Sequence, residues 1–68
     1  MEMRILNREV RLIGIDDAAK FLSISTSTLY GWVWQRRIPF IKIGRAVRFD
    51  LGDLERFIQA NRRAANPS

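Results

Sequence analysis

The sequence predicts a small, mainly α-helical domain that carries one β-hairpin, and three observations lead to this fold class. Two short amphipathic segments, residues 15–22 and 26–36, are separated by only three residues, which is typical of two helices joined by a tight turn. Alternating apolar and basic residues then surround a Gly-Arg dipeptide after Pro39, as in a hairpin. A capped apolar stripe follows Asp50. The 68 residues are enough for one domain only.

The first helix is expected over residues 15–22. Gly14 is an acceptable N-cap, and Asp16 and Asp17 place negative charge in the first turn, where the helix dipole favours it. The residues expected on the buried face are Ala18, Ala19, Phe21 and Leu22. Ser23 then breaks the apolar pattern, so a tight turn should lead into the next helix.

The second helix is expected over residues 26–36. Ser25 is a strong N-cap candidate. Pro39 ends the segment, because the residue before a proline is biased toward extended geometry. The apolar positions follow helical spacing and are Leu29, Trp32 and Val33. Tyr30 and Trp32 are expected in the core or at its edge.

The hairpin is expected over residues 40–49, and two registers are conceivable. A loop of two residues, 44–45, would pair Ile41 with Arg48 and bring an arginine onto the apolar face. A loop of three residues, 44–46, puts every apolar residue on one face and sets Lys42 opposite Arg48 on the other. Since a slip of one residue moves every side chain to the other face and three-residue loops are common, we predict the three-residue loop.

A third helix is expected after Asp50, which is its predicted N-cap. Its apolar stripe consists of Leu51, Leu54, Phe57 and Ile58. Arg62 and Arg63 lie where the C-terminal end of the helix dipole favours cations. Upstream of the first helix, a short strand is expected around residues 11–13. We therefore divide the chain into a flexible arm (1–10), a domain (11–63) and a disordered tail (64–68).

The composition argues against several kinds of site. The chain has no cysteine and no histidine, so it forms no disulfide and lacks the usual zinc ligands; we expect no metal and no cofactor. The carboxylates lie at predicted helix starts, and we expect no catalytic residue and no enzymatic activity. No apolar run approaches the ~18 residues of a membrane span, and no apolar segment follows Arg4 and Arg8 as in a signal peptide. The sequence thus predicts a cytoplasmic protein without membrane contact.

The positive charge is concentrated in one segment. The net charge is +5, and residues 36–48 hold five basic residues and no acidic one, whereas the charges of the remaining chain cancel. The five residues are Arg36, Arg37, Lys42, Arg45 and Arg48. Such a segment is typical of a surface that binds a polyanion, nucleic acid above all. The alternative is a solvated basic surface without a partner.

Two groups of side chains are candidates for contacts with double-stranded DNA. The second helix opens with four hydroxyl residues, Ser25, Thr26, Ser27 and Thr28. Hydroxyl groups and free backbone N–H groups at a helix N-terminus suit phosphates and base edges. In the predicted register, Lys42 and Arg48 lie side by side with Arg45 at the tip, and a phosphate between them would relieve their repulsion. Alternatively, Ser25 only caps the helix, the other three hydroxyl residues are solvated, and the basic side chains of the wing extend into water.

Two motifs in the predicted second helix and hairpin resemble those of a known family. The motifs are Ser25-x-Ser27-Thr28-Leu29-Tyr30 and Ile43-Gly44-Arg45-x-Val47-Arg48. In their order and spacing they resemble the excisionase-type helix-turn-helix family, small winged-helix proteins related to the DNA-binding domains of MerR-type regulators. The resemblance implies a winged helix-turn-helix, with a recognition helix over residues 26–36 in the major groove. It also implies a wing over residues 42–48 along the DNA backbone or the minor groove.

The resemblance further implies a function and a set of contact residues. Family members act as phage or mobile-element excisionases, which bend DNA together with an integrase, or as prophage transcription regulators. The residues expected to contact DNA are Ser25, Thr26, Ser27, Thr28, Tyr30, Gly31, Gln35, Arg36 and Arg37 of the recognition helix, and Lys42, Arg45 and Arg48 of the wing. Because one helix and one wing cover little DNA, we expect two or more copies, or one copy beside a partner protein, on each site.

The chain departs from the family pattern in its recognition helix. Thr26 and Gly31 stand where arginine is common, and Trp34 stands where a charged residue is common. Gly31 disfavours a helix by roughly 1 kcal/mol relative to alanine, which points either to close approach of DNA or to room for a bulky neighbour such as Trp34. Trp34 itself could pack on the domain, contact DNA sugars or anchor a partner protein. The alternative function is therefore a protein-interaction module of the same fold that recruits an integrase or polymerase.

Overall fold

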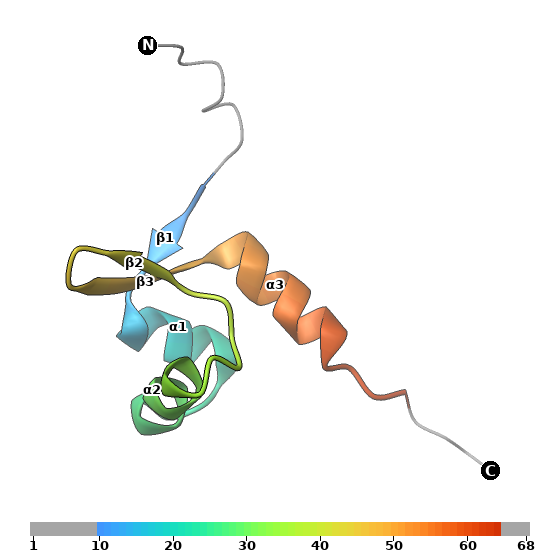
Figure 1. The fold of residues 1–68 in the computed structure, drawn as a ribbon. Helices are drawn as coiled ribbons and strands as arrows, with labels where there is room; N and C mark the ends of the chain where they lie inside the picture. The colour runs from blue at the N-terminus through green and yellow to red at the C-terminus, as the bar shows by residue number, and fades with distance from the viewer. Residues whose placement is uncertain (1–9, 65–68) are drawn as a thin grey trace.

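The computed structural model describes residues 10–64, which form three helices and a three-stranded antiparallel sheet (Figure 1). In chain order the elements are β1 (Leu12–Ile13), α1 (Ile15–Leu22), α2 (Thr26–Trp34), β2 (Ile41–Ile43), β3 (Ala46–Asp50) and α3 (Leu51–Ala60). This order is the predicted winged helix-turn-helix, in which the hairpin of β2 and β3 is the wing. Of the predicted arm and tail, residues 1–9 and 65–68 lie outside the described part of the chain.

The strand order is β1-β3-β2, so the short strand before α1 pairs with the strand that leads into α3. Ile13 lies opposite Phe49 in this pairing. Figure 1 shows the hairpin projecting to one side of the domain, with α1 and α2 beneath it and α3 leaving on the other side. None of the helices within residues 10–64 is long and apolar enough to cross a bilayer.

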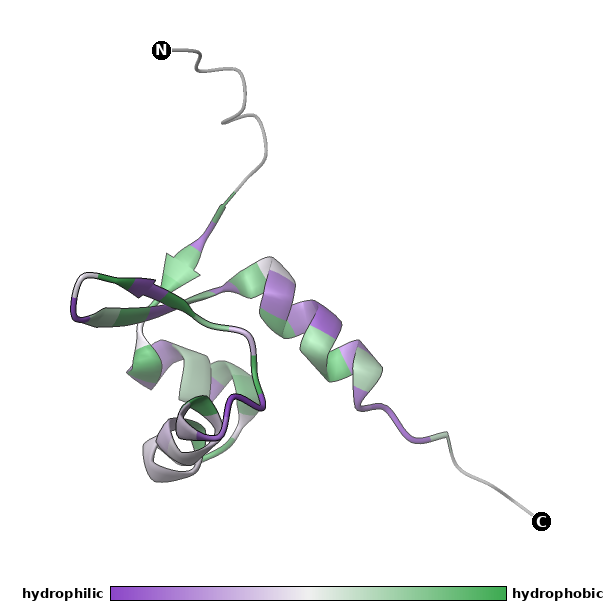
Figure 2. Cartoon of the chain, in the orientation of Figure 1, coloured by the Kyte–Doolittle hydropathy of each residue, from purple (hydrophilic) through white to green (hydrophobic). Residues whose placement is uncertain are grey.

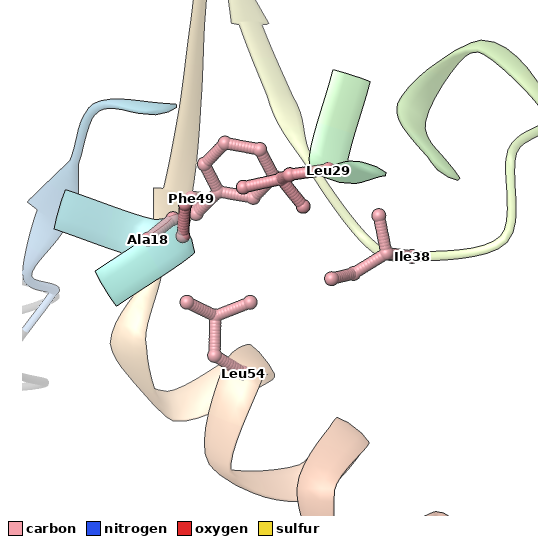
Figure 3. Packing of buried hydrophobic residues seen from close by; sticks show 6 residues of the cluster. Ala18, Leu29, Ile38, Phe49 and Leu54 are labelled. Atoms are coloured by element: carbon pink, nitrogen blue, oxygen red, sulfur yellow. The ribbon is translucent and has the colours of Figure 1, made fainter. Parts of the chain in front are cut away.

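One small core joins the three helices, the sheet and the loop after α2. Its buried residues are Ala18 and Ala19 of α1, Leu29 of α2, Ile38 of the loop, Phe49 of β3 and Leu54 of α3. Figure 3 shows the labelled side chains of this core pointing toward one another from these separate elements. The two alanines let α1 approach the sheet closely, while each large side chain contributes roughly 1.5–3 kcal/mol through its burial.

Phe21 does not lie on the buried face of α1, contrary to the prediction: its side chain is 41% exposed. The buried stripe instead follows Ile15, Ala18, Ala19 and Leu22, of which the two alanines are fully covered. This stripe repeats at three and four residues, and position 21 lies about a quarter turn or more away from its centre. The predicted bounds of α1 and its N-cap Gly14 are confirmed.

Both helices of the helix-turn-helix end in the same left-handed turn, and neither turn contains glycine. After α1, Ser23 has φ 58°, its N–H donates to the Lys20 carbonyl (3.1 Å), and the Ile24 N–H donates to the Ala19 carbonyl (3.0 Å). These two bonds form a Schellman motif, which satisfies carbonyls that the end of a helix leaves open. The turn delivers Ser25 directly to the N-cap of α2.

The second helix ends at Trp34, two residues before the predicted end. Arg36 has φ 57°, and the N–H groups of Arg36 and Arg37 donate to the carbonyls of Val33 (3.0 Å) and Trp32 (2.8 Å). A residue in the left-handed region cannot continue a right-handed helix. A glycine would have predicted such a position from the sequence, whereas an arginine does not. Gln35, Arg36 and Arg37 therefore form a turn rather than a last helical turn.

The predicted three-residue loop of the wing is wrong. Ile41 pairs with Arg48, Lys42 pairs with Val47 and Ile43 pairs with Ala46, so the loop is Gly44-Arg45. Gly44 has φ 61°, and a glycine with positive φ at the first loop position is the type II′ turn that suits the twist of a hairpin.

The physical reason is that the wing extends beyond the core, so burial does not select its register. The Val47 and Phe49 side of β3 faces the domain, with Phe49 fully buried, whereas Ile43 on the other side is 55% exposed. The turn geometry decides the pairing instead. As a consequence, Lys42 and Arg48 lie on opposite faces of the wing and do not repel each other across a strand pair.

The third helix follows the prediction at its start. The Asp50 carboxylate accepts a hydrogen bond from the Gly52 N–H (2.9 Å) and caps the helix. The helix ends at Ala60 with Asn61 as C-cap, so Arg62 and Arg63 lie beyond its last turn.

Replacing Ser23 by glycine should raise the free energy of unfolding by up to about 1 kcal/mol. The left-handed conformation costs an L-residue about 1–2 kcal/mol, whereas glycine loses about 0.5–1 kcal/mol more backbone entropy on folding, so relief of strain prevails. Urea unfolding followed by circular dichroism measures the difference. Ser27→Gly, the same replacement inside α2, should instead lower the stability by about 1 kcal/mol. A lower midpoint for Ser23→Gly would argue against the left-handed turn.

Candidate nucleic-acid interface

The hydroxyl residues at the start of α2 have two different roles. The Ser25 hydroxyl accepts from the Thr28 N–H (3.1 Å) and donates to the Thr28 hydroxyl (3.0 Å), so these two side chains satisfy each other. Thr26 and Ser27 are exposed, and neither side chain forms a hydrogen bond with another described residue. The capping alternative is thus confirmed for Ser25, while Thr26 and Ser27 keep their hydroxyls available to a ligand.

An exposed stripe continues from Ser27 along α2. Tyr30 is 55% exposed and Trp34 is 87% exposed, and their spacing from Ser27 puts them on the same face of the helix. The expectation that Tyr30 lies in or at the core is therefore wrong, and packing on the domain is not the role of Trp34. A Cβ at Gly31, on the same face, would meet no atom within 4 Å, so no bulky neighbour, Trp34 included, fills the space beside it.

The second helix carries no charged residue along its whole length, Thr26–Trp34. In Figure 2 it is accordingly pale over most of its surface, whereas the turn that follows it is strongly hydrophilic. From residue 18 to residue 49 the chain contains no acidic residue at all. The ion pair between Arg56 and Asp53 lies on α3, away from this region.

The five basic residues of the segment 36–48 do not form one continuous stripe. Arg45 occupies the tip of the wing, and Lys42 and Arg48 lie on its two faces. The Arg48 guanidinium donates to the Val47 carbonyl (2.8 Å). Each of these three side chains is exposed.

The two arginines after α2 lie on different sides of the domain. The Arg37 guanidinium lies 5.7 Å from the centre of the Trp32 ring and donates to the Gln35 side chain (3.3 Å). Trp32 in turn contacts the Phe57 ring of α3, with 5.9 Å between ring centres. This places Arg37 on the side of the helix-turn-helix that faces α3. Arg36 instead lies 5.9 Å from the centre of the Phe40 ring, on the side of the wing.

A groove of about 460 Å³ separates α2 from the wing; we call it the α2–wing groove. Its lining includes Tyr30, Trp34, Arg36, Phe40, Lys42 and Val47. The sequence alone does not predict this groove, because the groove depends on the hairpin register and on the turn at Arg36. The one available signal was the spacing of Ser27, Tyr30 and Trp34, which already predicts a shared helix face.

Comparison with known families identifies the arrangement. A family model for a helix-turn-helix domain matches residues 12–62. The chain belongs to this helix-turn-helix family, a family of DNA-binding domains. No curated protein and no solved structure gives a significant match to the chain. Within residues 10–64, no three side chains of metal-binding type lie close enough together to hold a metal ion.

Replacing Ser25 by alanine should lower the free energy of unfolding by about 1 kcal/mol, because the Thr28 N–H loses its partner at the helix start. Thermal and urea unfolding give the value. The control is Ser27→Ala, two residues along the chain, because the Ser27 side chain forms no hydrogen bond with a described residue. This variant should keep the free energy of unfolding within about 0.5 kcal/mol of the parent. Equal stability of the Ser25 variant and the parent would mean that the cap is not formed in solution.

Proposed function

We propose that this protein binds double-stranded DNA with sequence selectivity, with α2 in the major groove and the wing along the DNA backbone. The observation that carries the proposal is the charge pattern around α2. Its exposed face is uncharged, cations flank it in the turn after α2 and on the wing, and no acidic residue lies between positions 18 and 49. A polyanion is attracted to such a surface without repulsion from any carboxylate in the same segment.

Base recognition rests on the first turn of α2. Thr26 and Ser27 are exposed and have no partner among the described residues, and hydroxyls can contact the edge of any base in the major groove. The helix lacks the arginine that most often recognises guanine. Gly31 removes a side chain from the same face, which allows the helix backbone to approach the DNA closely.

The wing supplies contacts that do not depend on base sequence. Arg45 lies at the tip of the wing, and Lys42 and Arg48 lie behind it on the two faces. Because the two residues do not face each other, the support for a phosphate site is their exposure and the lack of any acidic residue from position 18 to position 49, rather than relief of a like-charge pair. Such contacts position a protein on DNA and carry most of its salt dependence.

The biological setting that fits best is excisionase-like: an architectural factor for recombination beside an integrase, or a prophage or mobile-element transcription regulator. One module of this kind covers roughly 600–1,000 Å² of protein surface, which favours two or more copies on each DNA site. The 87% exposure of Trp34 favours, as a second candidate, a protein-interaction module that recruits an integrase or polymerase. The salt dependence of DNA binding distinguishes the two functions.

Ser27→Ala should weaken binding to the cognate site more than binding to random DNA, by roughly 1 kcal/mol of discrimination for a lost base contact. Fluorescence anisotropy with a selected site and with a scrambled duplex measures both affinities. The unchanged stability expected for this variant removes unfolding as an explanation. An equal loss on both duplexes would contradict a role in base recognition.

Arg45→Ala should weaken binding to all sequences and reduce the slope of log affinity against log salt by roughly 0.9, the value for one lost phosphate contact. The control is Arg56→Ala, which makes the same change in net charge on α3, where Arg56 pairs with Asp53. The control should leave the slope nearly unchanged. If Arg45→Ala keeps both the affinity and the slope of the parent, the tip of the wing does not contact DNA.

A further inference from the structure

The α2–wing groove has apolar walls that no part of the described chain covers. Trp34 and Tyr30 form the wall on α2, and Phe40 and Val47 lie on the side of the wing. Trp34 is 87% exposed and Tyr30 is 55% exposed, which is unusual for two large aromatic side chains on neighbouring helical turns. Exposed aromatic residues that lie together mark a surface that is covered when the protein acts.

The same groove carries positive charge at two points. Lys42 on β2 and Arg36 in the turn after α2 both line it, and neither forms an ion pair with another described residue. The Arg36 guanidinium lies 5.9 Å from the centre of the Phe40 ring, so cation and apolar surface adjoin. Arg48, by contrast, lies on the opposite face of the wing and takes no part in the groove.

A ligand for this groove must therefore present apolar surface and negative charge side by side. A DNA strand does so at each nucleotide, because the C–H face of the deoxyribose alternates with a phosphate. The groove also continues the exposed stripe of α2 that begins at Ser27 and passes the open position of Gly31. A duplex in contact with the first turn of α2 and with the tip of the wing would bring one strand between them.

We propose that the α2–wing groove holds the sugar–phosphate backbone of one DNA strand, with deoxyribose packed on Trp34 and Tyr30 and a phosphate bound between Arg36 and Lys42. The inference rests on the proposed DNA-binding function and adds the surface that binds the backbone of one strand. Contacts to sugar and phosphate position a protein without reading its sequence. Trp34 thus contributes to affinity and Ser27 to selectivity.

The first test separates apolar from ionic contacts. Trp34→Ala should weaken binding to cognate and scrambled duplexes alike, at least about tenfold as for a tryptophan in the centre of an interface, with an unchanged salt slope. Lys42→Ala should weaken binding and lower the slope by roughly 0.9. Trp34→Phe should restore most of the affinity. Phe21→Ala, which removes an aromatic side chain that is 41% exposed on α1 and does not line the groove, is the matched control and should bind as the parent does.

The second test reports the position of Trp34 directly. In a Trp32→Phe variant, Trp34 is the only tryptophan, and its emission is followed while a DNA duplex is added. Acrylamide should quench the free protein strongly and the complex severalfold less, because the strand covers the indole. The affinity measurements above do not depend on the Trp32 replacement, so they stand even if that variant unfolds.

Three results would overturn the inference. The first is that Trp34→Ala binds DNA as the parent does, and that the indole of Trp34 in the Trp32→Phe variant is equally accessible with and without DNA. If Arg45→Ala still loses affinity, the proposed function then survives without the groove contact. A loss confined to the cognate duplex would mean that Trp34 reads bases. Shielding of Trp34 by a co-bound protein but not by DNA would assign the groove to a protein partner. Absence of salt-dependent DNA binding by the parent would instead remove the proposed function itself.

Discussion

The arrangement of the whole domain depends on the burial of Phe49. This residue lies on the central strand of the sheet, is fully buried, and pairs with Ile13 on one side. Leu29 and Leu54 reach it from α2 and α3, so its ring joins segments that lie far apart in the chain. A chain of this size has few large buried side chains to distribute: α2 and α3 contribute one leucine each, and α1 contributes two alanines. The orientation of α2 relative to the wing follows from this shared contact.

Two left-handed turns complete the geometry of the interface. Ser23 sets the angle between α1 and α2, and Arg36 redirects the chain from α2 toward the wing. Both positions carry a side chain where glycine would be less strained. At Arg36 the side chain has a use, because the turn brings its guanidinium beside Phe40 and into the α2–wing groove. A modest loss of stability is thereby coupled to the placement of a cation next to the candidate binding surface.

The wing lies outside the core and distributes its basic residues over both of its faces. With the two-residue loop at Gly44 and Arg45, each face of the wing carries one basic residue besides apolar ones. Lys42 belongs to the groove and Arg48 to the outer face, so the cations surround the wing instead of forming a pair. This distribution suits a wing that lies against a backbone of phosphates, since charge is available on more than one side.

The sequence by itself determined the order of the elements, the bounds of α1, the caps at Ser25 and Asp50, and the segment that holds the excess charge. These features depend on residues close together in the chain: hydroxyl and carboxylate caps, helical spacing of apolar residues, and turn residues. The sequence also shows that α2 is uncharged, because this property depends on composition alone.

Only the tertiary structure decided where those residues face. The end of α2 depended on a left-handed arginine that no propensity indicates, and the hairpin register depended on a turn because the wing buries too little surface to select one. The sequence predicts Phe21 on a buried face and Tyr30 in or at the core, and it leaves packing on the domain open for Trp34. All three remain exposed because Ala18, Leu29 and Phe49 already fill the small interior. Which apolar residues are left for a partner is settled by the volume of the core, a property of the packed chain rather than of any segment.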